Sequence, residues 1–130
     1  MARPLSGSWS SKYFRTKAST QYTKGMLVSS DGTDIIPSAT SSTNILGIVD
    51  QTKASGDATN DRIKILVPSS KRCTFLATGE ALTAAMEGRR FDVVSGSLGF
   101  DNAQTTYKVG LLVKCISATS GEFAAMDPIA

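Results

Sequence analysis

The sequence contains no histidine and only two cysteines among its 130 residues. Histidine is the commonest general base and the commonest metal ligand, so its absence removes the usual machinery of hydrolases and metal sites. The two thiols, Cys73 and Cys115, are too few to hold a structural zinc ion by themselves. The motifs of phosphate-binding loops and of activated serines are also missing. We therefore expect no enzymatic activity, no metal and no cofactor.

Long hydrophobic runs are missing too, and charged residues make up only 19% of the chain. Nothing approaches the run of roughly 18 apolar residues that a membrane-spanning helix requires. The first residues carry no apolar segment typical of a secretory signal, so we expect synthesis on the cytosolic side of a membrane. Because thiols stay reduced there, free thiols at Cys73 and Cys115 are favoured over a disulfide, which stays open as the alternative.

Carboxylate side chains are the remaining candidates for a metal-binding or catalytic site. Asp57 and Asp61 lie four residues apart in a polar loop that also contains Gly56 and Asn60. This spacing leaves a weak calcium site as an alternative to a solvated loop. Nothing in the sequence singles out a pair of carboxylates of the glycosidase type.

The sequence is rich instead in short β-branched and aromatic runs separated by polar turns. Residues 45–49, 62–67 and 73–77 are three such runs in succession. In the second, Ile63 and Ile65 alternate with charged residues, as expected for a half-buried strand. We expect the three runs to pair as a meander that forms one wall of a small β-barrel.

Further runs complete a turn-rich β domain. The remaining strands are predicted at 24–28, 34–37, 91–94, 107–116 and 122–126. Asp31-Gly32 predicts the tight turn between the first two of these, and Ala84 to Glu87 predicts a single helical turn that Gly88 ends. In the longest strand, we expect the face holding Tyr107, Val113 and Cys115 to be buried. About eight short strands and one helical turn predict an all-β barrel.

The N-terminal segment differs from the rest in charge. The first 24 residues hold five of the 14 basic residues and none of the 11 acidic residues, so the remainder is net −2. We expect residues 1–20 to form an extended arm and residues 21–130 to form the barrel domain, which should fold without the arm. The arm is either a solvated terminus or a segment that lies along an acidic surface of another molecule. Its aromatic residues either pack back on the barrel or anchor the arm to that partner.

Three parts of the sequence resemble the small head-decoration, or cement, proteins of tailed bacteriophages. They are residues 24–28 with Asp31-Gly32, residues 44–49 with their G-I-V strand, and residues 77–93 with 116–123. The first two are similar to the opening strand-turn and to the following strand of that family. The third is similar to segments of capsid-stabilising proteins of marine and podovirus-like phages. The likeness covers most of residues 24–126.

The resemblance implies a β-barrel or β-tulip that binds the outer surface of a phage capsid and stabilises it by bridging neighbouring major capsid subunits. It also implies self-association as a homotrimer, synthesis in the host cytoplasm, a final location in the virion, and no catalytic residues. Together with the charge and aromatic content of the arm, it leads us to assign capsid binding to seven residues. They are Arg3, Trp9, Lys12, Tyr13, Phe14, Arg15 and Lys17.

Two other functions are weighed against this one. A barrel with surface bases such as Lys71-Arg72 and Arg89-Arg90 is also typical of proteins that bind single-stranded nucleic acid. That function is less favoured because the body is net acidic and its aromatic residues are expected to be buried. Another minor virion protein, such as a head-fibre base or a tail component, is the second alternative.

Overall fold

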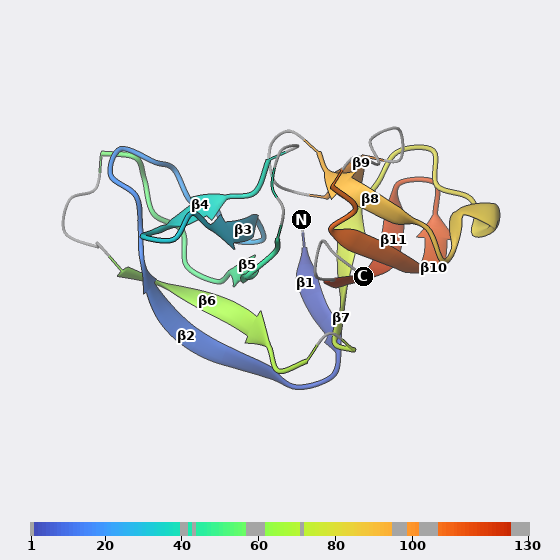
Figure 1. Cartoon of the computed structure of the whole chain (residues 1–130), viewed down its shortest axis with the longest axis horizontal. Coiled ribbons are helices and arrows are strands. Elements are labelled where there is room, and N and C mark those ends of the chain that lie inside the picture. The colour runs from blue at the N-terminus through green and yellow to red at the C-terminus, as the bar shows by residue number, and fades with distance from the viewer. Residues whose placement is uncertain are drawn as a thin grey trace.

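The structure is a computed structural model of the whole chain, and it describes residues 2–39, 42, 44–56, 62–70, 72–94, 99–101 and 107–125. Over these residues the chain forms eleven strands and one 3₁₀ turn, with 53% strand and 3% helix. The strands form two antiparallel sheets, and Figure 1 shows them side by side as two lobes. The all-β prediction is therefore confirmed.

The six-stranded sheet has its own aromatic core. Its strands, in spatial order, are β1 (Arg3–Ser6), β7 (Thr74–Thr78), β11 (Ser120–Ala125), β10 (Gly110–Ser117), β8 (Arg90–Val93) and β9 (Phe100–Asp101). Phe75, Phe100 and Phe123 are buried on its inner face. The rings of Phe100 and Phe123 stack with their centroids 4.3 Å apart. Buried aromatic residues of this size supply much of the hydrophobic stabilisation of a small lobe.

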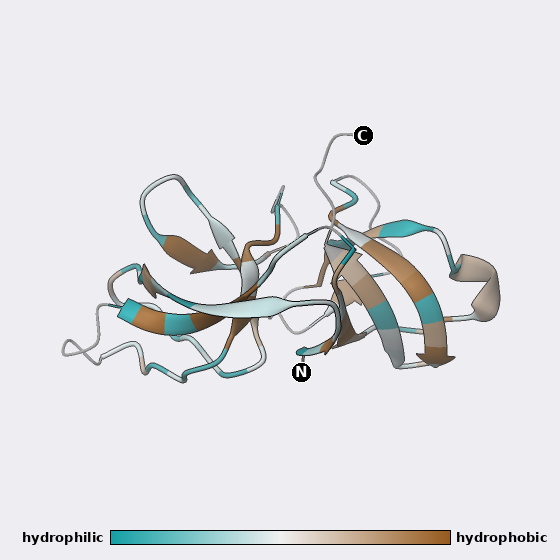
Figure 2. Ribbon diagram, turned by 90° about the horizontal axis from the view of Figure 1, so that it is seen from below, coloured by the Kyte–Doolittle hydropathy of each residue, from teal (hydrophilic) through white to brown (hydrophobic). Residues whose placement is uncertain are grey.

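The five-stranded sheet encloses a second core. Its spatial order is β2 (Trp9–Arg15), β6 (Arg62–Pro68), β5 (Gly47–Val49), β3 (Leu27–Ser30) and β4 (Ile35–Pro37). Along β6, the residues Ile63 and Ile65 are buried and alternate with charged residues, visible as bands of brown and teal in Figure 2. Tyr22 is fully buried in this core; its hydroxyl donates to the Ile35 carbonyl at 2.6 Å and accepts from Lys17 N at 2.9 Å.

Both sheets curl. A parallel bridge between Thr16 and Ile35 brings the end of β2 to β4, which is the opposite edge of the five-stranded sheet. A second parallel bridge, between Thr78 and Gly99, brings the end of β7 to the residue before β9. Each lobe is therefore a strongly bent sheet, and the core of the six-stranded lobe also includes Leu27 of β3 and Ile48 of β5 from the other sheet.

The two sheets are joined by a double connection. The chain passes from one sheet to the other between β1 and β2 and again between β6 and β7, and β1 pairs with β7 while β2 pairs with β6. Our meander prediction holds for β5 and β6, which pair, but it is wrong for β6 and β7, which lie in different sheets. Proline at position 68 ends β6 because it offers no N–H to continue a ladder. The chain then crosses over, and β7 pairs with β1 and β11.

The longest predicted strand contains an irregularity that the sequence does not reveal. Leu112 pairs with Phe123 and Lys114 pairs with Glu122, the next residue, so Val113 is the extra residue of a β-bulge. Leu112, which precedes the bulge, is buried, whereas Val113 is 42% exposed and Tyr107, which precedes the strand, is 36% exposed. The prediction that Tyr107 and Val113 lie on the buried face is therefore wrong.

The short-range turn predictions are confirmed. β3 and β4 flank Asp31-Gly32, where the Asp31 carboxylate accepts the N–H groups of Thr33 and Asp34 at 2.9 and 2.8 Å. The helical turn is the 3₁₀ element η1 (Ala84–Met86), and it ends before Gly88, which has a φ of +90°. This positive φ is the backbone conformation that glycine adopts without strain.

Candidate functional site

The first two strands form one edge of each sheet. Among the described strands, β1 pairs with β7 at the end of the six-stranded sheet, and β2 pairs with β6 at the end of the five-stranded sheet. Figure 1 shows β2 along the outer margin of its lobe. Residues 3–15, which we expected in an extended arm, thus include strands that pair with the two sheets. Pairing with β6 and β7 satisfies the backbone groups that face those strands, while the polar side chains of the segment stay in water.

The seven residues to which we assigned partner binding divide into two groups. The exposed group consists of Arg3, Lys12, Tyr13, Arg15 and Lys17, and the half-buried group consists of Trp9 and Phe14. Tyr13 is 61% exposed, which is unusual for a large aromatic side chain on a strand. The exposed group is therefore the part of this set that another molecule can reach.

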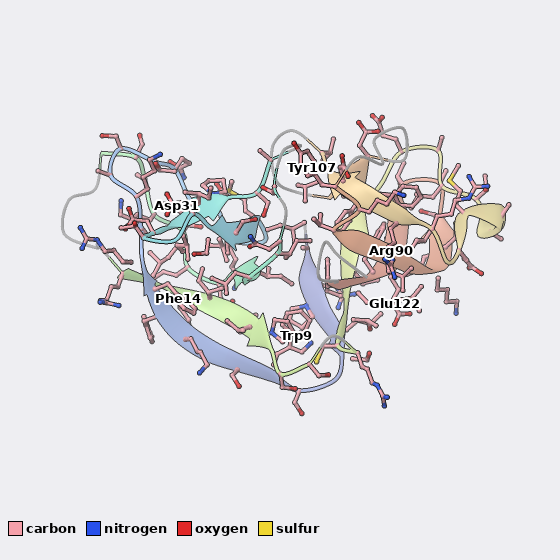
Figure 3. The ribbon with its side chains drawn as sticks, in the orientation of Figure 1. Trp9, Phe14, Asp31, Arg90, Tyr107 and Glu122 are labelled. Carbon is pink, nitrogen blue, oxygen red and sulfur yellow. The ribbon has the colours of Figure 1, made fainter. Side chains whose placement is uncertain are left out.

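The half-buried pair packs on the protein itself. The Trp9 ring meets the Phe75 ring edge-on, with centroids 6.1 Å apart, and its Nε1–H donates to the Ser6 carbonyl at 3.0 Å. Phe14 packs against the core of the five-stranded sheet. Figure 3 shows both side chains on the inner side of the curved β2 ribbon. Of the two alternatives for these aromatics, the structure has them packed back, where they hold β2 in place.

Tyr13 lies within a cationic surface formed by β2 and β6. Tyr13 is opposite Lys64 in the ladder, and Arg15 is opposite Arg62. Like charges directly opposite each other destabilise an antiparallel pair, so sheet stability does not explain this placement. We define Tyr13, Arg15, Arg62 and Lys64 as the β2–β6 cationic surface. It is suited to contact with a negatively charged partner.

Two carboxylates border this surface. Asp34 Oδ1 lies 3.2 Å from Arg15 Nε, and Asp50 lies 3.2 Å from Lys64 Nζ and 3.7 Å from Lys24 Nζ. The cationic partners are at least one-third exposed, and such surface ion pairs each contribute about 0–1 kcal/mol. They orient the long side chains more than they stabilise the fold, and the surface remains net positive.

The corner between β1 and β2 packs against the start of β7. The Ser8 carbonyl accepts the Ser69 N–H at 2.9 Å and the Cys73 thiol at 3.3 Å. Burial raises the pKa of the Cys73 thiol, but hydrogen bonds from the backbone and side chains of Ser69 and Ser70 outweigh it, so the net pKa is lowered. This corner fixes the direction in which the chain leaves one sheet and enters the other.

The other candidate sites predicted from the sequence bring fewer functional side chains together than the β2–β6 cationic surface does. Cys73 and Cys115 are both free thiols, as favoured; Cys73 is buried and Cys115 is half-buried. Asp57, Asp61 and Lys71, on which a calcium site and a basic doublet were considered, lie outside the described residues. Among the residues that are described, no three potential metal ligands of the His, Cys, Asp or Glu type come together.

Comparisons of this chain with protein-family models, with curated proteins and with solved structures find no match. The described part of the chain holds no helix whose length and apolar character would let it traverse a bilayer.

Our sequence reasoning missed the contribution of Arg62 and Lys64. Both alternate with Ile63 and Ile65 along β6, so the period of two already places them on the face opposite the core. Their position beside Tyr13 depends on the pairing of β2 with β6, which joins residues about fifty positions apart. No local sequence pattern predicts a contact between residues so far apart in the chain.

Proposed function

We propose that this protein is a structural component of a phage particle that binds the outer surface of the capsid and bridges neighbouring major capsid subunits. One observation carries the proposal: the acid-free N-terminal segment forms an exposed edge on both sheets and presents Arg3, Lys12, Tyr13, Arg15 and Lys17. Aromatic and arginine side chains dominate the energetics of protein interfaces. A basic edge carrying both is suited to an acidic protein surface.

The bridging role rests on the two-lobed architecture. The core cluster around Phe75 also includes Leu27 of β3 and Ile48 of β5, so it joins the two sheets, and the double connection at β1–β2 and β6–β7 links the lobes along the chain. A rigid body of this kind can contact two capsid subunits at once only while those subunits stay in place. Binding to the assembled shell then stabilises it by as much as the protein prefers the shell to separated subunits.

The finer features are part of the same proposal. Each curled sheet is proposed to form a small, partly open barrel; in the five-stranded one, β2 meets β4 at the Thr16–Ile35 bridge beyond its last residue. Three copies are proposed to assemble as a homotrimer on the shell. Trp9 and Phe14 hold β2 against the body, while Lys12, Tyr13 and Arg15 contact the capsid. The capsid-binding surface is thus proposed to be a fixed edge of the folded protein.

Cosedimentation with empty, undecorated capsid shells tests the proposal. We expect the wild-type protein to sediment with shells and the Lys12→Ser/Arg15→Ser variant to bind about tenfold more weakly, as for loss of two interface charges. The matched control is Arg89→Ser/Lys114→Ser, which removes two exposed charges from the other lobe, one just before β8 and one on β10. The control should bind like wild type. Wild-type protein that stays in the supernatant at every shell concentration would refute the proposed function.

The exposure of Tyr13 supports a second candidate, a surface for single-stranded nucleic acid. An exposed aromatic ring between cationic side chains can stack on a base while the cations contact phosphates. Binding of single-stranded DNA would then weaken steeply with salt, and Tyr13→Ala would weaken it at all salt concentrations. Absence of DNA binding by a protein that sediments with shells would eliminate this candidate.

A further inference from the structure

The four edge strands of the two sheets differ in how well they are protected. β1 contains Pro4 and a register shift between Pro4 and Ser6, β4 has three residues including Pro37, and β9 has two residues. Prolines, bulges and short length are the usual means by which proteins prevent an edge from pairing with another chain. β2 has none of them: its seven residues pair with β6 in unbroken register and contain no proline.

The backbone groups that β2 turns outward follow from the bonds of its neighbour. The Lys64 carbonyl accepts the Asp50 N–H at 2.9 Å, and the Lys64 N–H donates to Gln51 Oε1 at 3.2 Å. Both backbone groups of Lys64 therefore face β5 and not β2. Since Tyr13 is opposite Lys64, this pair is one of the non-hydrogen-bonded pairs of the ladder.

Alternation along the strand extends this result. If Tyr13 directs its N–H and C=O to the outer edge, Ser11 and Arg15 do the same, because strand residues alternate in direction. The residues between them, Lys12 and Phe14, bond to β6. The Thr16–Ile35 bridge brings β4 to this edge directly after Arg15, so the open donors and acceptors are those of Ser11 and Tyr13, which have the spacing of one further strand.

The positive charge of the β2 edge favours one kind of partner strand over another. Lys12 and Arg15 lie three residues apart, so they project from opposite faces of the sheet, and no acidic residue occurs in the first 24 positions. Antiparallel pairing of two copies about Lys12 would place the ammonium groups of the two Lys12 side chains side by side, which is unfavourable. A strand with carboxylates three residues apart would meet a cation on each face.

We propose that the outer edge of β2 accepts an extended acidic segment of another polypeptide, which adds as a sixth strand to the five-stranded sheet. This inference rests on the proposed function, in that the segment would belong to a capsid subunit. Strand addition supplies affinity through main-chain hydrogen bonds and specificity through side-chain positions. Here the specificity lies in a carboxylate that pairs with Lys12 on one face and in a second carboxylate that competes with Asp34 for Arg15 on the other.

A synthetic peptide tests the edge directly on the full-length protein. The probe is a capped peptide of threonine and valine, as long as β2, with two glutamates three residues apart. We expect it to slow amide hydrogen exchange at Ser11 and Tyr13, because those N–H groups become bonded. The same peptide with lysines in place of the glutamates should bind much more weakly.

A matched pair of variants separates backbone pairing from side-chain contact. Ser11→Pro removes an outward N–H that β6 does not use, whereas Ser11→Thr changes the side chain and keeps the N–H. Loss of one hydrogen bond should weaken binding of the acidic peptide by about fivefold to tenfold in Ser11→Pro, with Ser11→Thr unchanged. Lys12→Glu, which leaves the backbone intact, should reverse the preference between the two peptides even if Ser11→Pro fails to fold.

The outcomes distinguish this inference from the proposed function. Equal binding of the acidic peptide to Ser11→Pro and Ser11→Thr, protection confined to other strands, or equal binding of the lysine peptide would overturn strand addition. Dimers of wild-type protein in light scattering that Ser11→Pro abolishes would also overturn it, because the occupant would be a second copy. If shells bind Ser11→Pro as tightly as wild type, the protein binds the capsid but does not do so through the outer edge of β2. If the protein binds the peptide but not the shells, the proposed capsid function is wrong, and strand addition at the β2 edge is still supported.

Discussion

Gly7 lies directly against Cys73 where the chain passes between the two sheets. A Cβ placed on Gly7 would lie 2.6 Å from Cys73 Sγ and 3.0 Å from its Cα, and Gly7 has a φ of +84°. Position 7 therefore excludes a side chain for two independent reasons, the backbone conformation and the lack of space. The close approach lets the β1–β2 corner pack onto the start of β7.

Gly7→Ala should destabilise the protein by about 2–4 kcal/mol, the combined effect of a left-handed backbone and of overpacking. Gly32→Ala is the matched control, since Gly32 has a φ of +98° but nothing within 4 Å of its would-be Cβ. It should lose only about 1–2 kcal/mol. Chemical unfolding of both variants measures the difference. Equal losses of unfolding free energy in the two variants would mean that the close contact with Cys73 does not affect stability.

Tyr22→Phe should reduce the free energy of unfolding by about 1–3 kcal/mol, because Ile35 O loses a buried partner and Lys17 N loses a partly buried one. Burial, as the largest cause, raises the pKa of Tyr22 above 10.0. The corresponding stability is complete below pH 10 and is lost as pH rises through the folded-state pKa. Unfolding titrations should show this alkaline loss in wild type and not in Tyr22→Phe. Tyr13→Phe, at an exposed site, is the control and should behave like wild type.

Local features of the fold could be predicted because short-range chemistry determines them. The alternation of Ile63 and Ile65 with charged residues identified β6, and Asp31-Gly32 identified the β3–β4 turn. The bulge at Val113 could not be predicted from the sequence. It depends on where β10 and β11 fall out of register, and the amino-acid composition of these strands gives no sign of that position.

The candidate site was only half predictable for a related reason. Ser10, Ser11 and Lys12 lack the apolar alternation of a half-buried strand, so they read as a flexible arm. They become a strand because β6 offers a partner ladder about fifty positions later. The basic, acid-free character of the segment was visible in the sequence, whereas its role as the unprotected edge of a sheet depends on non-local pairing.

The turn at Asp31 should contribute acid-sensitive stability. The backbone N–H of Asp34 and then that of Thr33 lower the pKa of the Asp31 carboxyl below 3.8, because both bonds favour the charged form. This stability is present above pH 3.8 and disappears as pH falls through the folded-state pKa. NMR titration should therefore show Asp31 titrating below an ordinary aspartate. Asp31→Asn, which keeps an acceptor but cannot ionise, should make stability less dependent on acid, and an unchanged acid profile would contradict this role.

Deletion of residues 1–20 should now be expected to destabilise the body as well as to abolish partner binding. The deleted segment includes Ala2, which is buried and donates its N–H to the Gly25 carbonyl at 2.9 Å, and it includes both β1 and β2. Its removal uncovers β6 and the Phe75 ring. Partial exposure of each buried side chain costs about 1 kcal/mol or more, a large share of the roughly 5–15 kcal/mol that holds a typical domain together.

Thermal and denaturant unfolding of the truncated chain measure this effect, and the full-length Lys12→Ser/Arg15→Ser variant supplies the comparison. That variant loses the charges of the edge but keeps both strands, so its unfolding free energy should stay within about 0.5 kcal/mol of wild type. Weak shell binding by both proteins, with instability only in the truncated one, would separate the charge of the edge from its structural role. A truncated chain that unfolds cooperatively at the wild-type midpoint would instead show that β1 and β2 contribute nothing to either core, and that the N-terminal segment acts as the independent arm its sequence suggests.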